Sequence, residues 1–582
     1  MFKLFKCSTC SLSDRFFSEL EQCQPKSEQF EHVNNLNKIM LDQWFGKPFW
    51  FTLGALVGGF LLSIAVFHNL GEGIFLAVAG LGVLALTIWR LEYGLLAAFA
   101  ELFANSHGHL VSTEVFGFDL SLREVIFLGV MLGWLVLLVT RKTKLQIKDN
   151  RILIFLPLFL AIVIGYAVGF AQNEAGKAFN DGNGYFYLAY LFPILSVKWD
   201  LIKQRQLLQV MAAAAIWVTA LTLGLLYLFT HLSGEALVSI YRFIRDTRTG
   251  ELTRMSGVIF RIFLQAQFSA IIFALLIAPW LWLKEISKKT RIHLVFILAL
   301  LISVALISLS RSFWVGLIVA AVPFIVLIIS LLKPTVKRFA SSSGLAITSG
   351  IAATIILAVV TLFPIPYRLG SLTDLTWLFS SRTSDLGDVA ISSRWNLLPE
   401  MWEEIKTAPL LGSGFGEEVT FKTDDPRARS ISPDGTWTTY AFEWGWLDLW
   451  LKMGLLGPLA FLWLFYGLLK GLLRDEVRLE RNPSEVELSS TKVDKSRPAW
   501  LTIGLVSGLF MLYATHIFSP YLNHPLGLGF ILFLVPFINF SLAQRKVTKE
   551  TLPLYLRPST KAVEPSSAAW LANSLADSVE QK

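Results

Sequence analysis

The sequence has little cysteine. Its 582 residues include three, Cys7, Cys10 and Cys23, and none after that point. A chain without later cysteines cannot hold its later loops together with disulfides. The pair Cys7-x-x-Cys10 has the spacing of half a zinc site, but such a site needs four ligands and no second pair follows. We therefore interpret all three cysteines as reduced thiols.

Charge is also scarce. Only 16% of the residues are charged and 54% are hydrophobic, whereas soluble domains average about 25% charged residues. This composition excludes an ordinary soluble enzyme and favours a membrane protein. The net charge of +8 fits basic loops that face anionic lipid, so we expect membrane lipids and no nucleic acid as partners.

The first 49 residues are polar and mixed in charge, without an apolar core after the opening residues. They do not have the pattern of a cleavable signal peptide, and we predict a cytoplasmic arm. The last segment, after Val547, is rich in Ser, Ala and Pro, and we expect a loosely ordered tail.

Long apolar runs occupy most of the remaining chain, and a membrane span needs roughly 20 apolar residues. About fourteen segments qualify, two of them short enough to be tilted or re-entrant. They are 50–67, 71–89, 94–104 (short), 124–140, 152–170, 185–197 (short), 207–229, 262–283, 293–309, 313–332, 345–363, 445–469, 500–518 and 526–540. The sequence thus predicts an all-α, polytopic membrane helix bundle of about 12–14 spans.

Loop charge predicts the orientation. Six basic clusters, in 141–151, 198–205, 284–291, 333–338, 470–497 and 545–549, fall on one side when the segments are threaded alternately. That side is cytoplasmic by the positive-inside rule. We therefore divide the chain into a cytoplasmic arm (1–49), a transmembrane bundle (50–363), a large periplasmic loop (364–444), C-terminal transmembrane helices (445–541) and a cytoplasmic tail (542–582).

Several arginines fall on the outer side, against this charge rule, and need a partner there. They are Arg242, Arg245, Arg248, Arg254, Arg261, Arg311 and Arg394. A guanidinium matches diphosphate oxygens better than any other side chain. A lipid-linked diphosphate sugar is thus the first ligand to consider. For the first three arginines, which are spaced by three residues, a solvated face is the simpler interpretation.

The predicted periplasmic loop has two local patterns. Leu398, Trp402 and Ile405 have helical spacing, which predicts a short amphipathic helix from about Pro399, lying on the membrane or packed on neighbouring spans. The run Pro409-Leu-Leu-Gly-Ser-Gly-Phe-Gly416 follows. Its glycines could bring backbone N–H groups around a phosphate, or form a plain flexible turn.

Four motifs together resemble the O-antigen ligase family, which also covers polysaccharide polymerases of the bacterial inner membrane. They are Arg254-Met-Ser-Gly257, Ser310-Arg311-Ser312, Arg394-Trp395 followed by the glycine-rich run, and Leu451-Lys-Met-Gly-Leu-Leu-Gly457. Each motif is degenerate alone, but their order, spacing and common sidedness agree with that family from about residue 50 to residue 540.

The resemblance implies a multi-pass, GT-C-like glycosyltransferase without a metal or other cofactor. It implies transfer of a glycan from undecaprenyl diphosphate to a saccharide or lipid acceptor on the periplasmic face. Outer arginines would hold the diphosphate, and a histidine near the end of the large loop would help to activate the acceptor. At that histidine position this sequence has Glu443, followed by Trp444.

We assign candidate roles accordingly. Arg254, Arg261, Arg311 and Arg394 are the predicted diphosphate ligands. Arg311 is also a predicted catalytic residue, since a fixed cation stabilises the leaving phosphate; the alternative is an arginine that reaches lipid headgroups.

Glu443 is the predicted general base, and the alternative is a salt bridge that anchors the loop. His516 is the second choice for the base, and His524 could also reach the outer face. A histidine at a helix end is often only a hydrogen-bonded interface residue.

Metal ligands are few on the predicted outer side. The first outer loop, 68–73, has one carboxylate, and the paired acids Asp424 and Asp425 are better explained as a solvated turn before Pro426. A transporter or flippase of lipid-linked sugars is the alternative function, but we find no internal repeat. A non-catalytic scaffold is a third possibility, because Glu443 stands at the position where the resemblance implies a histidine.

Overall fold

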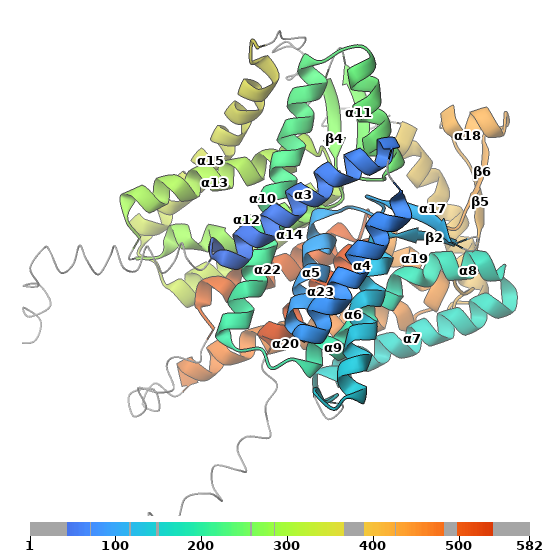
Figure 1. Cartoon of the computed structure of the whole chain (residues 1–582), viewed down its shortest axis with the longest axis horizontal. Coiled ribbons are helices and arrows are strands. Elements are labelled where there is room, and N and C mark those ends of the chain that lie inside the picture. The colour runs from blue at the N-terminus through green and yellow to red at the C-terminus, as the bar shows by residue number, and fades with distance from the viewer. Residues whose placement is uncertain are drawn as a thin grey trace, which may run out of the picture. The chain divides into compact units, whose positions relative to one another are not determined.

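The computed structural model describes residues 44–69, 71–115, 118–146, 150–256, 259–284, 286–365, 389–424, 426–481 and 497–538, and elements keep the labels of Figure 1. Most of the predicted arm, with its cysteines, and the predicted tail lie outside these residues. The chain divides into residues 1–538 and 539–582, and the first unit is the one described below.

Helices dominate this unit. They are α3 (Lys47–Asn69), α4 (Glu72–Trp89), α5 (Leu91–Ala104), α6 (Leu122–Val139), α7 (Asn150–Gln172), α8 (Ala175–Gly182), η1 (Asn183–Tyr190), α9 (Leu191–Ser196), α10 (Leu201–His231), α11 (Glu235–Asp246), α12 (Gln267–Ile277), η2 (Ala278–Trp282), α13 (Lys288–Ile307), α14 (Arg311–Leu327), η3 (Ile328–Leu332), α15 (Val336–Leu362), α17 (Val389–Thr407), α18 (Pro426–Ile431), α19 (Gly445–Met453), α20 (Leu456–Arg481), α22 (Ala499–Thr515), α23 (Pro525–Leu534) and η5 (Val535–Phe537). Every predicted span overlaps a helix or a pair of consecutive helices.

Nine of the described helices are long and apolar enough to cross a membrane, and three shorter apolar helices accompany them. The prediction of an all-α, polytopic membrane bundle is confirmed. Large apolar side chains remain exposed along the helices at the periphery of the bundle, for example Trp50, Phe51, Ile318 and Ile351. Such surfaces are what a helix presents to lipid.

The strands form three small antiparallel hairpins. β1 (Ser112–Val115) pairs with β2 (Phe118–Ser121), β3 (Glu251–Ser256) with β4 (Ile259–Phe263), and β5 (Val419–Lys422) with β6 (Thr436–Thr439). Here one expectation was wrong, because β4 occupies the start of the predicted span 262–283 and α12 begins only at Gln267. The β-branched and aromatic residues of β4, Ile-Phe-Arg-Ile-Phe, favour a strand.

Small residues let helices pack closely in the bundle. A Cβ on Gly129 of α6 would lie 3.0 Å from the Gly80 carbonyl of α4, and one on Gly133 would lie 2.6 Å from the Thr87 side chain. A Cβ on Gly316 of α14 would lie 2.4 Å from the Thr515 hydroxyl of α22. In a membrane such contacts replace the hydrophobic driving force between helices.

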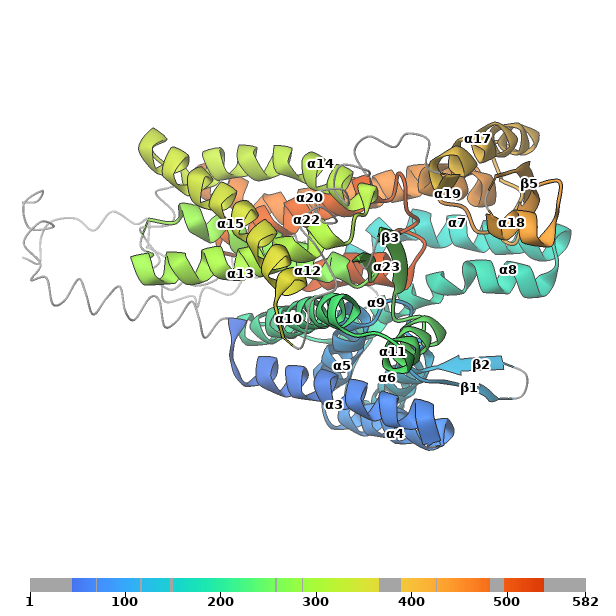
Figure 2. The same ribbon diagram turned by 90° about the horizontal axis from the view of Figure 1, so that it is seen from above.

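The connections gather at two ends, as alternate threading requires. At one end Ser106 Oγ donates to the Thr249 carbonyl (2.7 Å), and Ser519 Oγ donates to Ser312 Oγ (3.0 Å). Figure 2 shows α8, α18 and the hairpin β1–β2 toward this end. We name it the outer end, because the charge rule predicts that it faces away from the cytoplasm.

Connections of the other set bond to one another. Thr143 Oγ1 donates to the Ser196 carbonyl (3.4 Å), Lys203 pairs with Glu92 (3.3 Å), and Gln204 Nε2 donates to the Pro536 carbonyl (2.9 Å). These bonds join helix ends and connections that alternate threading places on the same side, while the cytoplasmic assignment stays a prediction.

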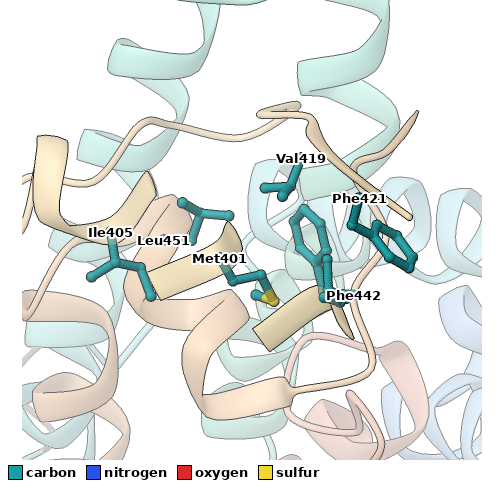
Figure 3. Packing of buried hydrophobic residues seen from close by; sticks show 7 residues of the cluster. Met401, Ile405, Val419, Phe421, Phe442 and Leu451 are labelled. Carbon is teal, nitrogen blue, oxygen red and sulfur yellow. The ribbon is translucent and has the colours of Figure 1, made fainter. Parts of the chain in front are cut away.

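The described part of the long outer segment, 389–424 and 426–444, has a core of its own. Leu397, Met401 and Ile405 of α17 pack against Val419 and Phe421 of β5, together with Phe442 and Leu451 (Figure 3). The predicted amphipathic helix exists, but it begins at Val389 and contains Pro399. Its buried stripe is 397, 401 and 405 rather than 398, 402 and 405, and Trp402 is 42% exposed.

A buried group of three charges holds this segment to the bundle. Lys452 Nζ of α19 lies 2.6 Å from Asp181 Oδ1 at the end of α8 and 2.6 Å from Asp448 Oδ1, and it donates to the Tyr440 carbonyl (2.8 Å). The three side chains are at most 8% exposed. Asn523 Nδ2 donates to Asp448, and the Gly416 N–H donates to Asp181 Oδ2. We call Asp181, Asp448 and Lys452 the charge clamp.

We predict that Lys452→Met strongly destabilises the protein. The change leaves two buried carboxylates without their cation, and removing one partner of a buried ion pair typically costs about 3–5 kcal/mol. Thermal unfolding of the purified protein, followed by tryptophan fluorescence, measures the loss. The control is Lys406→Met on α17, where an exposed lysine pairs with Glu403 and little change is expected. Equal melting temperatures for both variants would contradict the clamp.

Candidate functional site

A polar pocket of about 450 Å³ opens at the outer end. The loop after α5 contributes Ser106 and His107 to this pocket. Helix α11 and the turn that follows it contribute Tyr241, Arg245 and Arg248. Strand β3 gives Glu251 and Thr253. Two of the outer arginines that the sequence assigned to a solvated face are indeed exposed, but they also line this pocket.

The hairpin β3–β4 sorts the next two arginines onto different faces. Cross-strand partners share a face, so Arg254 lies with its partner Phe260, and Arg261 with its partner Thr253. Arg254 and Arg261 therefore lie on opposite faces of the hairpin. Leu252 and Thr253, from the two faces of β3, both line the polar pocket, and Arg254 is exposed near the tip of the hairpin.

Arg261 connects the pocket to the turn that begins α14. Its Nε donates to the Ser308 carbonyl (2.9 Å), and its guanidinium lies 4.8 Å from the centre of the Phe263 ring. Arg311 is the first residue of α14, three residues after Ser308, and is half-buried. The structure thus brings Arg261 next to the turn that carries Arg311.

The loop 516–524 packs behind this turn. Ser519 bonds to Ser312, and Tyr521 packs against Phe313 with ring centres 5.8 Å apart. The Tyr521 hydroxyl also donates to the carbonyl of Gln265, which lines the pocket (3.3 Å). One loop therefore supports both the pocket and the Arg311 turn.

The same loop contacts the residues around Glu443. Trp444 lies 5.5 Å from Phe518 by ring centres, and its Nε1 donates to the Arg394 carbonyl (2.8 Å). Arg394 and Glu443 form an ion pair, with side chains 33% and 52% exposed. The salt bridge that the sequence left as an alternative for Glu443 is therefore present, and its partner is another predicted site residue.

His516 is fully buried. Its Nδ1 accepts the Leu522 N–H (3.1 Å), and Trp446 packs on its ring (5.5 Å). Because Nδ1 accepts a hydrogen bond, the neutral imidazole carries its proton on Nε2. Neither ring nitrogen is then available to accept a proton from an acceptor hydroxyl. This geometry fits a support for the loop 516–524 better than a general base.

An apolar pocket of about 410 Å³ lies across α11 from the polar one. Phe60 and Ile64 of α3, Trp217 and Leu221 of α10, and Ile240 and Phe243 of α11 line it. One face of α11 thus borders an apolar pocket and the other a cationic pocket. An amphiphile with an anionic head and a hydrocarbon chain has the matching chemistry.

The glycine-rich run proves to be packed against helices. Gly412, Gly414 and Gly416 have φ values of +75°, +84° and +83°. The N–H groups of Ser413, Phe415 and Gly416 donate to the Leu451 carbonyl, the Gly165 carbonyl and Asp181. These amides are occupied, so the phosphate cradle considered from the sequence does not form with them, and the turn is closely packed rather than flexible.

Two histidines that sequence reasoning missed lie in or beside the pocket. His107 is exposed where it lines the pocket, but the protein around it and the charge of Arg123 lower its pKa to about 4. His107 is therefore neutral near pH 7. Its ring lies 5.4 Å from that of His524. His109 lies 3.4 Å from Arg248 Nη1. The sequence feature that could have indicated these histidines is the polar run after the short apolar segment 94–104, which contains both of them.

Arg123 and Glu101 form a second buried pair that was missed. Arg123 Nε lies 3.0 Å from Glu101 Oε2, and Arg123 Nη2 donates to the Asn105 carbonyl (2.7 Å). The pair joins α5 to α6 and fixes the loop that carries His107. Charges at the edges of two predicted spans were the available signal.

The outer arginines can stabilise negative charge at the outer end. Arg245 and Arg248 line the polar pocket, and Arg261 of β4 bonds to the turn that precedes Arg311. Among the residues that the structure describes, no group of three or more His, Cys, Asp or Glu could hold a metal ion. Asp424, one of the paired outer acids, pairs with Arg429.

The long apolar helices and their exposed apolar side chains define a polytopic membrane protein with arginines at one end. Residues 296–462 match the family model described as O-antigen ligase. The resemblance seen in the motifs is confirmed in that segment. Together with the apolar helices, the match supports a multi-pass membrane protein of the glycosyltransferase type that acts in polysaccharide biosynthesis. No curated protein and no solved structure matches it.

The matched segment spans most of α13, all of α14 and α15, the outer segment, α19 and the start of α20. It contains Arg311, Arg394 and Glu443. Arg254, Arg261 and His516 lie outside it, so their candidate roles depend on the geometry of this chain alone.

We predict that Gly414→Ala destabilises the protein. A Cβ there would lie 2.3 Å from the Gly169 backbone nitrogen at a left-handed φ, and strain of this kind costs about 1–3 kcal/mol. The matched control is Gly344→Ala in α15, where a Cβ meets nothing within 4 Å. Melting temperatures of the two variants provide the comparison, and an unchanged value for Gly414→Ala would mean that the run is loosely packed.

Proposed function

We propose that this protein transfers a glycan from an undecaprenyl diphosphate donor to a saccharide or lipid acceptor on the periplasmic face of the bacterial inner membrane. The observation that carries the proposal is the pair of pockets on opposite faces of α11. The diphosphate occupies the cationic pocket and the first isoprene units occupy the apolar one. The O-antigen ligase domain in residues 296–462 supports the same reaction.

The chemistry has two requirements. The acceptor oxygen attacks the anomeric carbon, the bond from that carbon to the diphosphate oxygen breaks, and the diphosphate leaves with the electron pair. In this proposal Arg245 and Arg248 receive the diphosphate in the pocket that they line, and Arg261 and Arg311 stabilise the growing negative charge. Arg254 and Arg394 are further ligands of the incoming donor. Fixed donors of this kind contribute about 10²–10³ in rate each.

The acceptor proton goes to a base, and Glu443 is our assignment. It lies beside Arg394, and its side chain is 52% exposed, which leaves the carboxylate within reach of an acceptor. The geometry of His516 gives that residue the second place, as a support of the loop 516–524.

The reaction needs no metal in this proposal, and the test is transfer by purified protein without nucleotide or ion gradient. We predict that transfer from a lipid-diphosphate glycan continues in excess EDTA, because arginines carry the phosphate charge. Loss of transfer with EDTA and its recovery with magnesium or manganese would overturn the metal-free assignment and direct attention to Asp424 and Asp425. Transport of the donor without any transfer would instead support a flippase.

We predict that Arg311→Lys is nearly as damaging as Arg311→Ala, with transfer reduced about 10²-fold or more. An ammonium group cannot supply the two parallel N–H donors of a guanidinium. The control is Arg338→Lys in the first turn of α15, at the opposite end of the bundle, which we expect to be silent. Full activity of Arg311→Lys would mean that Arg311 only contacts lipid headgroups.

We predict that Glu443→Gln lowers single-turnover transfer by about 10²–10⁴ while the melting temperature changes little. Glu443→His should restore part of the rate, since the related enzymes use histidine at this position. The opposite pattern, in which the Gln variant melts earlier but the folded protein reacts normally, would make Glu443 only the structural partner of Arg394.

A further inference from the structure

The outer segment has a groove of about 490 Å³ to which the proposed function assigns no role so far. Helix α17 contributes Trp395, Asn396 and Glu400 on one side, and strands β5 and β6 contribute Thr420, Lys422 and Thr436 on the other. We propose that this groove is a glycan subsite, in which Trp395 stacks on a sugar ring. This inference rests on the proposed function, because it names the site that holds the sugar part of a substrate.

The lining has the chemistry that a sugar requires. A pyranose ring has an apolar C–H face and a rim of hydroxyls. Trp395 is 57% exposed and offers a broad apolar surface, and large aromatic side chains bind well at low cost in conformational entropy. An amide, a carboxylate, an ammonium group and two hydroxyls surround it, so both donors and acceptors are available.

The groove is also held rigidly. Trp395 packs edge-to-face against Trp444, with ring centres 5.4 Å apart. Asn396 Nδ2 donates to the Lys422 carbonyl (3.2 Å), which fixes the amide and ties the two walls together. Phe421, which is 7% exposed, joins the floor to the core of the outer segment (Figure 3). A preformed site loses little entropy when it binds a ligand.

A glycan fits this groove better than the membrane surface does. Anionic membranes attract clusters of lysine and arginine beside apolar anchors, whereas the groove has one cation and one carboxylate. The apolar residues better placed for a membrane are Leu410 and Leu411, which are 69% and 59% exposed and do not line the groove.

The position of the groove links it to the reaction. Trp395 directly follows Arg394. Trp444, which packs edge-to-face against Trp395, directly follows Glu443. A sugar chain that lies on Trp395 is therefore next to the Arg394–Glu443 pair. Either the acceptor saccharide or the far end of the donor glycan could occupy the groove, since both present the same sugar chemistry.

The binding experiment uses the full chain in detergent and an immobilised panel of soluble oligosaccharides of neutral hexoses and N-acetylhexosamines. We expect the wild type to bind a subset, Trp395→Ala to bind at least about tenfold more weakly, and Trp395→Tyr to recover part of the loss. The control is Trp402→Ala, two turns further along α17 and outside the groove, which should bind normally. Wild type that binds no glycan, or Trp395→Ala that binds like wild type, overturns the subsite.

Two further arms separate the subsite from the proposed function. Arg311→Ala should keep glycan binding while it loses transfer. If no transfer occurs at all but Trp395-dependent binding remains, the proposed function fails and the subsite stands. If transfer occurs and Trp395→Ala leaves binding and both KM values unchanged, the subsite fails. A raised KM for the acceptor alone assigns the groove to the acceptor, and a raised KM for the donor alone assigns it to the donor glycan.

Discussion

The buried contact of Lys452 with Asp181 and Asp448 is the interaction on which the outer end depends. It joins α19 to the end of α8, and through hydrogen bonds it also reaches Gly416 and Asn523. A lysine in such a setting is stable only because two carboxylates and the Tyr440 carbonyl replace its water. The glycine-rich run, the outer segment and the loop 516–524 thereby take fixed positions relative to the bundle.

Once those positions are fixed, the candidate site follows from packing. Its charged residues come from α11, the hairpin β3–β4, the start of α14, α17 and the segment before α19. The site therefore forms only when all of these elements pack together. The loop 516–524 is the common support, because it touches Ser312, Gln265 and Trp444. A bundle built in this way can tolerate a polar pocket at its end, because the surrounding helices satisfy the irregular backbone there.

The fold was largely readable from the sequence, because apolar length and loop charge are local signals. Short segments such as 94–104 and 185–197 were recognised for the same reason. The hairpin β3–β4 was missed because its apolar residues run directly into α12, so strand and helix merged into one predicted span. The stripe on α17 was shifted by one residue, since Trp402 looks apolar in sequence but remains exposed beside Trp450.

The candidate site was only partly readable. Outer arginines stand out because they oppose the charge rule, but a sequence does not tell which of them line a pocket. Arg245 and Arg248 line one, and Arg254 lies at the tip of a hairpin. The pairing of Arg394 with Glu443 could be stated only as an alternative. His107 and the charge clamp depend on residues far apart in the chain, and no local pattern predicts such partners.

The charge clamp also sets an order for biogenesis. Asp181 and Lys452 are separated by 271 positions in the chain. While the ribosome is still making the middle helices, Asp181 has no cation, and the glycine-rich run has no place to dock. The outer end can therefore assemble only after α19 has emerged and inserted. Until then the nascent protein holds an uncompensated carboxylate at the end of α8.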